Sequence, residues 1–223
     1  MEKRAIQFGS YNTAASGGWT LNQWTLSPAL HTTNRVSIPG RDGTLELATA
    51  LTDGAPTYGS RTLTARLESS EGTRLEREAI INAMTNWLDG WTVDIQLPDD
   101  SLHYLTGRVS VAREYNDPAH AAVVVTAICD PWRYNNAETV VQLTATEEPQ
   151  TAQIINNGRR TVVPLLTITA EEGATVLLVF GSSSWALGAG VYKLPDIVLT
   201  QGSHALTYSG AGSVTLTYRE AVL

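Results

Sequence analysis

Short segments that favour β-strands recur along most of the chain, and their spacing constrains the fold more than any other feature. Arg61–Glu68 alternates apolar and polar residues, as a strand with one buried face does. Ala121–Cys129 is a continuous apolar run rich in valine and alanine, which is typical of a strand buried on both faces. The chain is therefore predicted to be mainly β.

Further strands are expected on both sides of these two segments. In the first part of the chain they are residues 19–26, Trp91–Leu97 and Tyr104–Val111. Asn157-Gly158 is a hairpin turn signal, and turns recur about every 8–12 residues, which favours a β-sandwich. The strands expected after residue 134 are Thr139–Thr146, Ala152–Ile155, Val162–Thr169, Thr175–Phe180, Ile197–Thr200, Ala205–Tyr208 and Ser213–Tyr218.

One amphipathic helix is expected between the strands, from about Leu75 to Asp89. Thr73 and Glu76 have the spacing of a capping box, in which each side chain accepts a hydrogen bond from the other residue's backbone N–H. Gly90 suits a left-handed C-terminal cap. The apolar residues at helical spacing are expected to pack on a sheet; they are Leu75, Ala79, Ile80, Ala83, Met84, Trp87 and Leu88.

A domain boundary is expected near residues 130–136. Pro131 should end the preceding strand, and Asn135-Asn136 supplies a turn. After this point the pattern consists of strands only. Two domains are therefore predicted, residues 1–134 with the helix and residues 135–223 as a β-sandwich.

Composition excludes several classes of protein. The 22 acidic residues outnumber the 15 basic ones, for a net charge of −7, which argues against a nucleic-acid-binding patch. Cys129 is the single cysteine, so no intramolecular disulfide forms, and its place at the end of an apolar strand predicts an inert core thiol. The uncharged span Gly173–Tyr192 contains glycines and three consecutive serines, which favours strand and turn over a membrane helix. No secretory signal is expected, because no apolar run follows the N-terminal charges.

The residues that usually carry catalysis do not form a recognisable motif. None of the four histidines (His31, His103, His120 and His204) lies in a metal-ligand motif. The chain has no nucleophile elbow, no phosphate-binding loop and no dinucleotide-binding glycine pattern. No catalytic, metal or cofactor site is therefore predicted. An enzyme acting on glycosides would need carboxylates such as Asp99 or Glu171 on separate elements facing one bond.

A binding module is the alternative function. The aromatic residues Trp185, Tyr192 and Tyr208 lie in the second domain, and aromatic faces at the rim of a β-sandwich can stack on sugars. Trp185 and Tyr192 are the candidate sugar-stacking residues of a carbohydrate-binding or host-surface adhesion module. Packing in the core is the competing interpretation of the same residues.

Several short motifs occur in a characteristic order. In the first half they are Ile38–Gly43, the strand with Arg61, Trp87–Gly90, Pro98-Asp99-Asp100 with Tyr104, Gly107-Arg108, and Cys129-Asp130-Pro131 with Tyr134. In the second half they are Asn157-Gly158, Pro164, Gly190–Asp196, Leu199 with Gly202, and Gly212–Tyr218 with Arg219-Glu220. With these motifs, residues 1–134 resemble the distal tail proteins of long-tailed bacteriophages with non-contractile tails, and the second half resembles the galectin-like β-sandwich of the same family.

This resemblance implies a structural role in a phage tail tip. It implies a first domain like tail-tube proteins, a β-barrel or sandwich with one helix, that closes a homo-hexameric ring. The implied partners are the major tail tube protein and the tail-tip (tail-associated) protein, with the tape measure protein as a further candidate. DNA would leave through the central channel without specific binding. The implied location is the tail tip of the virion, after assembly in the host cytoplasm.

The resemblance suggests a role for the turn Pro39–Gly43. Arg41 and Asp42 become candidates for the ring interface, pairing with each other or with a neighbouring subunit. A ring needs a head-to-tail contact that closes, and pairing of edge strands between neighbours would supply one while protecting those edges. The net negative charge further predicts a neutral or acidic channel wall, along which a polyanion can slide.

Overall fold

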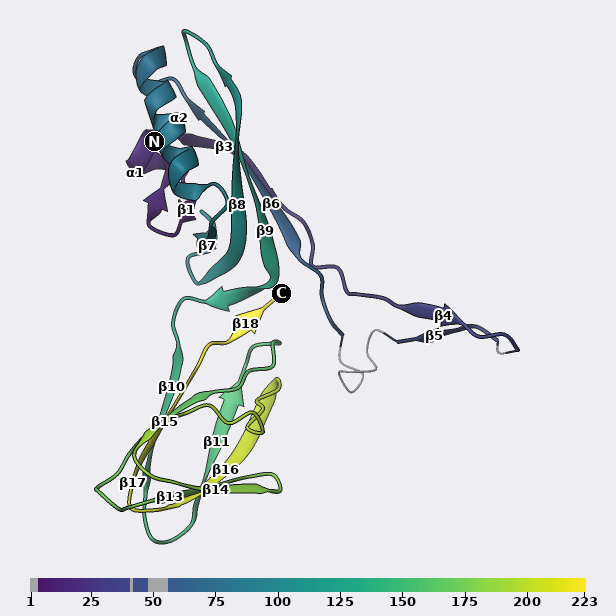
Figure 1. Cartoon of the computed structure of the whole chain (residues 1–223), viewed down its shortest axis with the longest axis vertical. Coiled ribbons are helices and arrows are strands. Elements are labelled where there is room, and N and C mark those ends of the chain that lie inside the picture. The colour runs from purple at the N-terminus through teal and green to yellow at the C-terminus, as the bar shows by residue number, and fades with distance from the viewer. Residues whose placement is uncertain (1–3, 41, 48–55) are drawn as a thin grey trace. The chain divides into compact units, whose positions relative to one another are not determined.

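The computed structural model describes residues 4–40, 42–47 and 56–223. The chain forms two compact units that divide between Arg133 and Tyr134 (Figure 1). Both are built mainly from β-strands, which confirms the predicted fold class. Each unit has its own hydrophobic core, so each is described separately.

The first unit contains one large sheet and one long helix. The strands of the sheet are ordered β2-β1-β7-β8-β9-β6-β3, and a separate two-stranded sheet pairs β4 with β5. In chain order the elements are β1 (Gln7–Phe8), β2 (Tyr11–Asn12), α1 (Thr13–Gly17), β3 (Thr20–Leu26), β4 (Arg35–Ser37), β5 (Thr44–Glu46), β6 (Arg61–Ser69), α2 (Arg74–Leu88), β7 (Thr92–Gln96), β8 (His103–Asn116) and β9 (Ala121–Asn135).

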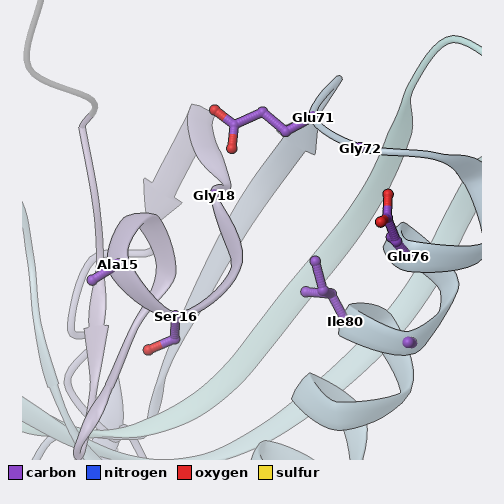
Figure 2. A pocket seen from close by; sticks show the side chains of 8 residues that line it. Ala15, Ser16, Gly18, Glu71, Gly72, Glu76 and Ile80 are labelled. Carbon is purple, nitrogen blue, oxygen red and sulfur yellow. The ribbon is translucent and has the colours of Figure 1, made fainter.

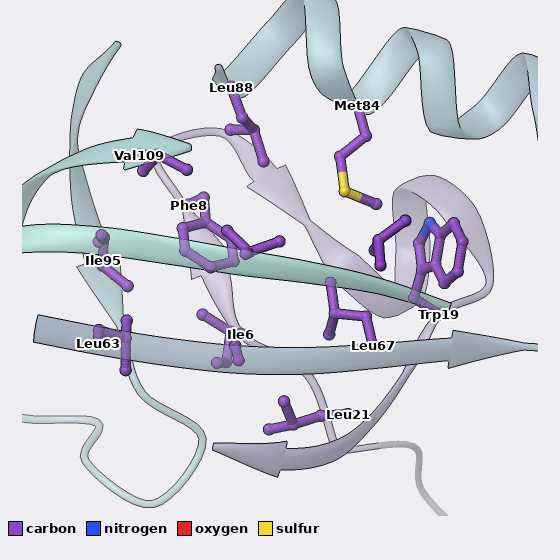
Figure 3. Close-up of a cluster of buried hydrophobic side chains, with 14 of the residues drawn as sticks. Ile6, Phe8, Trp19, Leu21, Leu63, Leu67, Met84, Leu88, Ile95 and Val109 are labelled. Atoms are coloured by element: carbon purple, nitrogen blue, oxygen red, sulfur yellow. The ribbon is translucent and has the colours of Figure 1, made fainter. Parts of the chain in front are cut away.

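The core of the first unit lies between one face of this sheet and α2 (Figure 3). Alternation in β6 places Leu63 and Leu67 on this face of the sheet. They pair with Ala127 and Val123 of β9, and all four residues are buried. From the helix, the buried side chains of Ile81, Met84 and Leu88 cover the same face.

Cys129 is a buried thiol of this core, as expected from its sequence context. Burial raises its pKa to about 11, so the thiol stays protonated. Gly107 of β8 lies against it, and a Cβ placed on Gly107 would come within 2.6 Å of the Cys129 Sγ and 3.1 Å of the Ile128 carbonyl oxygen.

This close approach yields a stability prediction. Gly107→Ala is expected to lower the free energy of unfolding by about 2 kcal/mol, because the new methyl group overpacks the core. Gly59→Ala is the matched control, since its Cβ would meet only the Leu30 carbonyl oxygen at 3.7 Å. Urea unfolding of both variants measures the difference in stability. Equal midpoints would show that β8 and β9 move apart at little cost to accept the methyl group.

The capping box of α2 is confirmed. The Thr73 N–H donates to the Glu76 carboxylate at 2.7 Å, and the Glu76 N–H donates to the Thr73 hydroxyl at 3.3 Å. Glu76 has a lowered pKa, chiefly because of its hydrogen bond from the Thr73 backbone. The helix therefore begins where its sequence predicts.

The predicted packing face of α2 is partly wrong. The side chains of Leu75 and Trp87 are 81% and 60% exposed, while Arg77 and Ile81 are buried. Apolar residues occupy two faces of this helix, and the sequence pattern alone does not say which of them meets the sheet. The face with Ile81, Met84 and Leu88 does so.

The burial of Arg77 has a specific cause. One guanidinium nitrogen donates to the Gly72 carbonyl oxygen at 2.7 Å, and another donates to the carbonyl oxygens of Asp117 and Pro118 at 2.7 and 3.1 Å. The side chain thus fixes the start of α2 to the turn between β8 and β9. Its aliphatic stem is buried in the process.

The second unit is a β-sandwich of two four-stranded sheets, β10-β17-β12-β15 and β11-β16-β13-β14. Buried leucines from both sheets form one core. No helix in the described ranges is long and apolar enough to cross a membrane. The strands are β10 (Thr139–Ala145), β11 (Gln150–Asn156), β12 (Leu165–Thr169), β13 (Val176–Phe180), β14 (Ser183–Leu187), β15 (Gly190–Tyr192), β16 (Gly202–Gly210) and β17 (Gly212–Tyr218); a further short strand, β18 (Ala221–Val222), belongs to neither sheet and pairs with β9.

The turn at Asn157-Gly158 does not close a hairpin, so that prediction is wrong. The strands on either side of it belong to different sheets, because β11 pairs with β16 and β12 pairs with β15 and β17. The Glu220 carboxylate instead accepts hydrogen bonds from the Asn157 backbone at 3.0 Å and side chain at 3.2 Å. The turn therefore connects the two sheets and is held by the C-terminal segment.

Candidate assembly interface

The hairpin formed by β4 and β5 projects from the first unit (Figure 1). Arg35 pairs with Glu46 in register, and Ser37 pairs with Thr44. We call the described residues 32–40 and 42–47 the arm. Gly40 and Gly43, which follow β4 and precede β5, have φ angles of 84° and 78°, which glycine adopts without a steric penalty.

The root of the arm is fixed by hydrogen bonds to the main sheet. The Arg61 side chain donates to the Ser27 carbonyl oxygen at 2.8 Å, and the Thr62 N–H donates to the Ser27 hydroxyl at 2.8 Å. The Gly59 N–H donates to the Leu30 carbonyl oxygen at 2.8 Å. These hydrogen bonds hold the two segments that flank the arm against each other.

The arm itself exposes apolar side chains. Val36 is 41% exposed and Ile38 is 39% exposed. A two-stranded hairpin without a further layer is only marginally stable in water. These features together are typical of a segment that packs against another molecule.

One of the two candidate ring-interface residues, Asp42, falls between the two strands of this hairpin. Asp42 is exposed there. Arg41 lies outside the described residues, so its pairing with Asp42 or with a neighbouring subunit stays a prediction. The sequence did signal the turn, but it gave no sign that the turn lies at the end of a projecting arm.

The face of the main sheet opposite α2 is rich in hydroxyl groups. We call it the threonine face. It carries three carboxylates and two guanidinium groups, and Arg66 pairs with both Glu68 and Glu114, at 2.5 and 2.6 Å. Strand register and alternation place these residues on it: Thr62, Thr64, Arg66, Glu68, Thr92, Asp94, Thr106, Arg108, Ser110, Glu114, Val124, Thr126 and Ile128.

The main sheet ends in β3 on one side and β2 on the other. The register of β3 against β6 shifts between Leu21 and Gln23. Such irregularities twist an edge and discourage uncontrolled pairing. The Leu21 N–H donates to the Arg4 carbonyl oxygen at 3.1 Å, so the edge of β3 is partly covered near its start.

The candidate sugar-stacking residues are placed on edge strands of different sheets. Trp185 lies in β14 and Tyr192 in β15. Both side chains are half-buried and pack against the core of the second unit, and the Tyr192 hydroxyl donates to the Gly188 carbonyl oxygen at 3.2 Å. Sugar binding by these two residues stays a prediction.

The paired carboxylates of the first unit support a turn. The Asp100 carboxylate accepts hydrogen bonds from the backbone of Leu102 and His103, and it contacts the His103 ring at 2.8 Å. Burial is the largest single influence on this carboxyl and raises its pKa, but the hydrogen bonds from His103, together with the charges of His103 and Arg133, leave the pKa lowered. No group of three or more potential metal ligands is found among the described residues.

Comparison with known proteins gives an informative likeness among solved structures. No protein-family model and no curated protein matches the chain. Among solved structures, the Dit protein (gp 19.1) of phage SPP1 superposes with a TM-score of 0.69 at 14% sequence identity, over 98% of this chain and 99% of that one. That protein is described as a paradigm of the hub adsorption apparatus in phages that infect Gram-positive bacteria. In fold, over nearly its whole length, this chain is therefore a counterpart of a phage distal tail protein.

Proposed function

We propose that the chain is a structural hub of a phage tail tip. The observation that carries this proposal is the likeness to a hub protein over 98% of the chain, which includes both units and the order in which they occur. The projecting arm supports it, because an exposed hairpin with apolar side chains fits a protein that works in an assembly.

The hub forms a homo-hexameric ring in which the first unit makes the contacts between copies. The arm, with Asp42 exposed in it, reaches a neighbouring copy, and Arg41 is the second candidate residue for this contact. Beyond its partly covered start, the edge of β3 offers backbone groups for pairing along the ring. The second unit then lies outside these contacts and stays available for other tail components.

The threonine face lines the channel in this proposal. Its hydroxyl groups hold water, and its carboxylates Glu68, Asp94 and Glu114 slightly outnumber the guanidinium groups of Arg66 and Arg108. Such a wall does not bind phosphates strongly, because tight DNA binding requires clustered cations. DNA can therefore pass without being held.

The proposed partners follow from the position of the ring. The major tail tube protein lies on one side and the tail-tip protein on the other, with the tape measure protein as a further contact. The role is geometric and involves no catalysis. The protein is assembled in the host cytoplasm and ends at the tail tip of the virion.

Mass in solution tests the ring. We expect the full chain, 24.0 kDa as a monomer, to populate a species of six copies in mass photometry and sedimentation equilibrium as concentration rises. Deleting the arm by joining Thr32 to Thr57 through a short glycine linker should abolish that species and leave the unfolding transition of the second unit unchanged. Hexamers that persist without the arm would contradict its part in ring closure.

A further inference from the structure

The turn Asn157-Gly158, which connects the two sheets of the second unit, is the only asparagine–glycine pair in the sequence. An asparagine loses ammonia most easily when glycine follows it. The glycine nitrogen attacks the asparagine side chain with no Cβ in the way, and glycine adopts the backbone angles that the product ring requires. The Asn157 side chain is exposed, so water reaches it. Residue types and exposure therefore make Asn157 a candidate for deamidation.

Deamidation at this pair has two steps. In the first, a bond forms between the Gly158 nitrogen and the Asn157 Cγ, and the bond from Cγ to Nδ2 breaks. Nδ2 leaves as ammonia with the proton from the Gly158 nitrogen, and a cyclic imide remains. In the second step, water opens the imide at either of its carbonyl groups and gives aspartate or isoaspartate at position 157. Water is the only other reactant, and the chain gains one negative charge.

The folded second unit holds the attacking nitrogen in place. Gly158 is buried, and its N–H donates to the Asn156 side-chain oxygen at 2.9 Å. Its backbone also packs against residues 219–223, which we call the C-terminal segment. A Cβ on Gly158 would come within 2.6 Å of the Ala221 nitrogen and 2.8 Å of the Ala221 oxygen. Because the attacking nitrogen must give up its proton to solvent, the reaction requires that its hydrogen bond breaks and that this segment moves away.

The side chain under attack is held by the same segment. The Glu220 carboxylate accepts hydrogen bonds from the Asn157 N–H at 3.0 Å and from its Nδ2 at 3.2 Å, and Glu220 is 7% exposed. Backbone hydrogen bonds fix the segment in turn. The Asn135 N–H donates to the Glu220 carbonyl oxygen at 3.0 Å, and the Arg160 N–H donates to the Ala221 carbonyl oxygen at 3.3 Å. Both reacting groups are therefore immobilised where the C-terminal segment packs.

We propose that Asn157 is a deamidation site that the C-terminal segment keeps closed. Chain ends open locally at lower cost than the whole domain unfolds. Because deamidation is slow compared with such local opening, its rate follows the population of molecules in which the segment is open. This site belongs to the second unit alone and does not depend on the ring.

The product of the reaction weakens the closed state. Aspartate at position 157 lacks the Nδ2 donor and places a second carboxylate beside Glu220. Like charges in a site that water reaches poorly repel strongly, because they are screened little. The segment of a reacted chain therefore opens more easily, and the change is one-way because ammonia has left. In a virion, where chains are not replaced after assembly, closure of the segment sets how long the second unit keeps its native turn.

The deamidation rate of the full chain tests this gate. Peptide mapping by mass spectrometry follows Asn157 during incubation at mildly alkaline pH, with digestion in mild acid so that handling adds no product. The native chain should react at least about tenfold more slowly than the chain unfolded in urea. Glu220→Ala removes the acceptor of two hydrogen bonds and should raise the native rate by roughly tenfold or more.

Glu71→Ala is the matched control for loss of a carboxylate. The Glu71 carboxylate also lies against a glycine, Gly18, at the groove between α1 and α2 of the first unit (Figure 2). Its removal should leave the rate at Asn157 unchanged. Equal rates in the wild type and Glu220→Ala, or a native rate equal to that of the unfolded chain, would overturn the proposal.

Low urea concentrations separate opening of the segment from global unfolding, and they serve even if Glu220→Ala destabilises the whole second unit. Local opening exposes little surface, so the rate in the wild type should stay nearly flat below the unfolding transition, whereas a reaction through global unfolding climbs steeply with urea. A flat response supports the gate. A rate that climbs in step with global unfolding would show that the segment does not open by itself.

Asn157→Asp reproduces the charge of the product and tests its effect on the segment. Hydrogen exchange followed by mass spectrometry should show residues 219–223 exchanging roughly tenfold faster than in the wild type. Asn157→Ser removes the amide without adding a charge and should give a smaller rise. Wild-type exchange in the Asn157→Asp chain would overturn the one-way effect of the reaction.

Discussion

Arg77→Met is expected to lower the free energy of unfolding of the first unit by about 3 kcal/mol. The guanidinium group of Arg77 supplies donors to three carbonyl oxygens, those of Gly72, Asp117 and Pro118. Methionine preserves the buried stem but removes these part-buried hydrogen bonds, and a hydrogen bond from a charged donor contributes about 1.5–3 kcal/mol. The substitution also removes a buried charge and the Arg77 Nε, which has no hydrogen-bond partner. Removing these groups is favourable and partly offsets the loss of stability.

Arg77→Lys separates the role of charge from that of geometry. An ammonium group cannot reach carbonyl oxygens on both sides at once, so lysine should recover less than half of the loss. Urea unfolding followed by circular dichroism gives the comparison. A neutral surface change alters the free energy of unfolding by less than about 0.5 kcal/mol. A loss no larger than this for the methionine variant would show that water replaces the guanidinium group and that the Arg77 hydrogen bonds to the turn are dispensable.

Asn156→Leu is expected to destabilise the second unit by about 3 kcal/mol. Asn156 is fully buried; its amide nitrogen donates to the carbonyl oxygens of Leu199 and Arg160 at 2.9 and 3.0 Å. Its side-chain oxygen accepts from the Gly158 N–H at 2.9 Å. Leucine has a similar size but satisfies none of these groups, and three unpaired polar groups would remain at the crossing between the sheets.

Gln153→Leu provides the matched control in the same strand. Gln153 is exposed and accepts one hydrogen bond from Ser203 at 2.8 Å, so its replacement should change the free energy of unfolding by less than about 0.5 kcal/mol. Equal unfolding midpoints for the two leucine variants would mean that the Asn156 network contributes little. A selective loss at Asn156 would establish it as the support of the inter-sheet turn.

Strands and caps were the part of the fold that sequence could predict. Alternation located β6 within one residue of its end, and the capping box located the start of α2. Pro131 predicts the end of β9 too early, because the strand continues through the proline to Asn135. Proline is tolerated in a strand where no ladder hydrogen bond from its nitrogen is needed.

The features that depend on long-range contacts could not be predicted. Arg77 is buried by carbonyl groups some forty residues away in the chain, and no local pattern signals them. The strands of the arm have three residues each, too few for periodicity to register. The helix face was misjudged for a related reason: α2 is apolar on two sides, and only the folded sheet decides which side is covered.

The central claim, a ring closed by the first unit, is tested most directly by electron microscopy of the full chain. We expect class averages with six-fold symmetry, a central hole lined by the threonine face, and inter-copy density that joins each arm to the next first unit. Six-fold rings in which the second units make the contacts, or particles that remain single copies at every concentration, would contradict it.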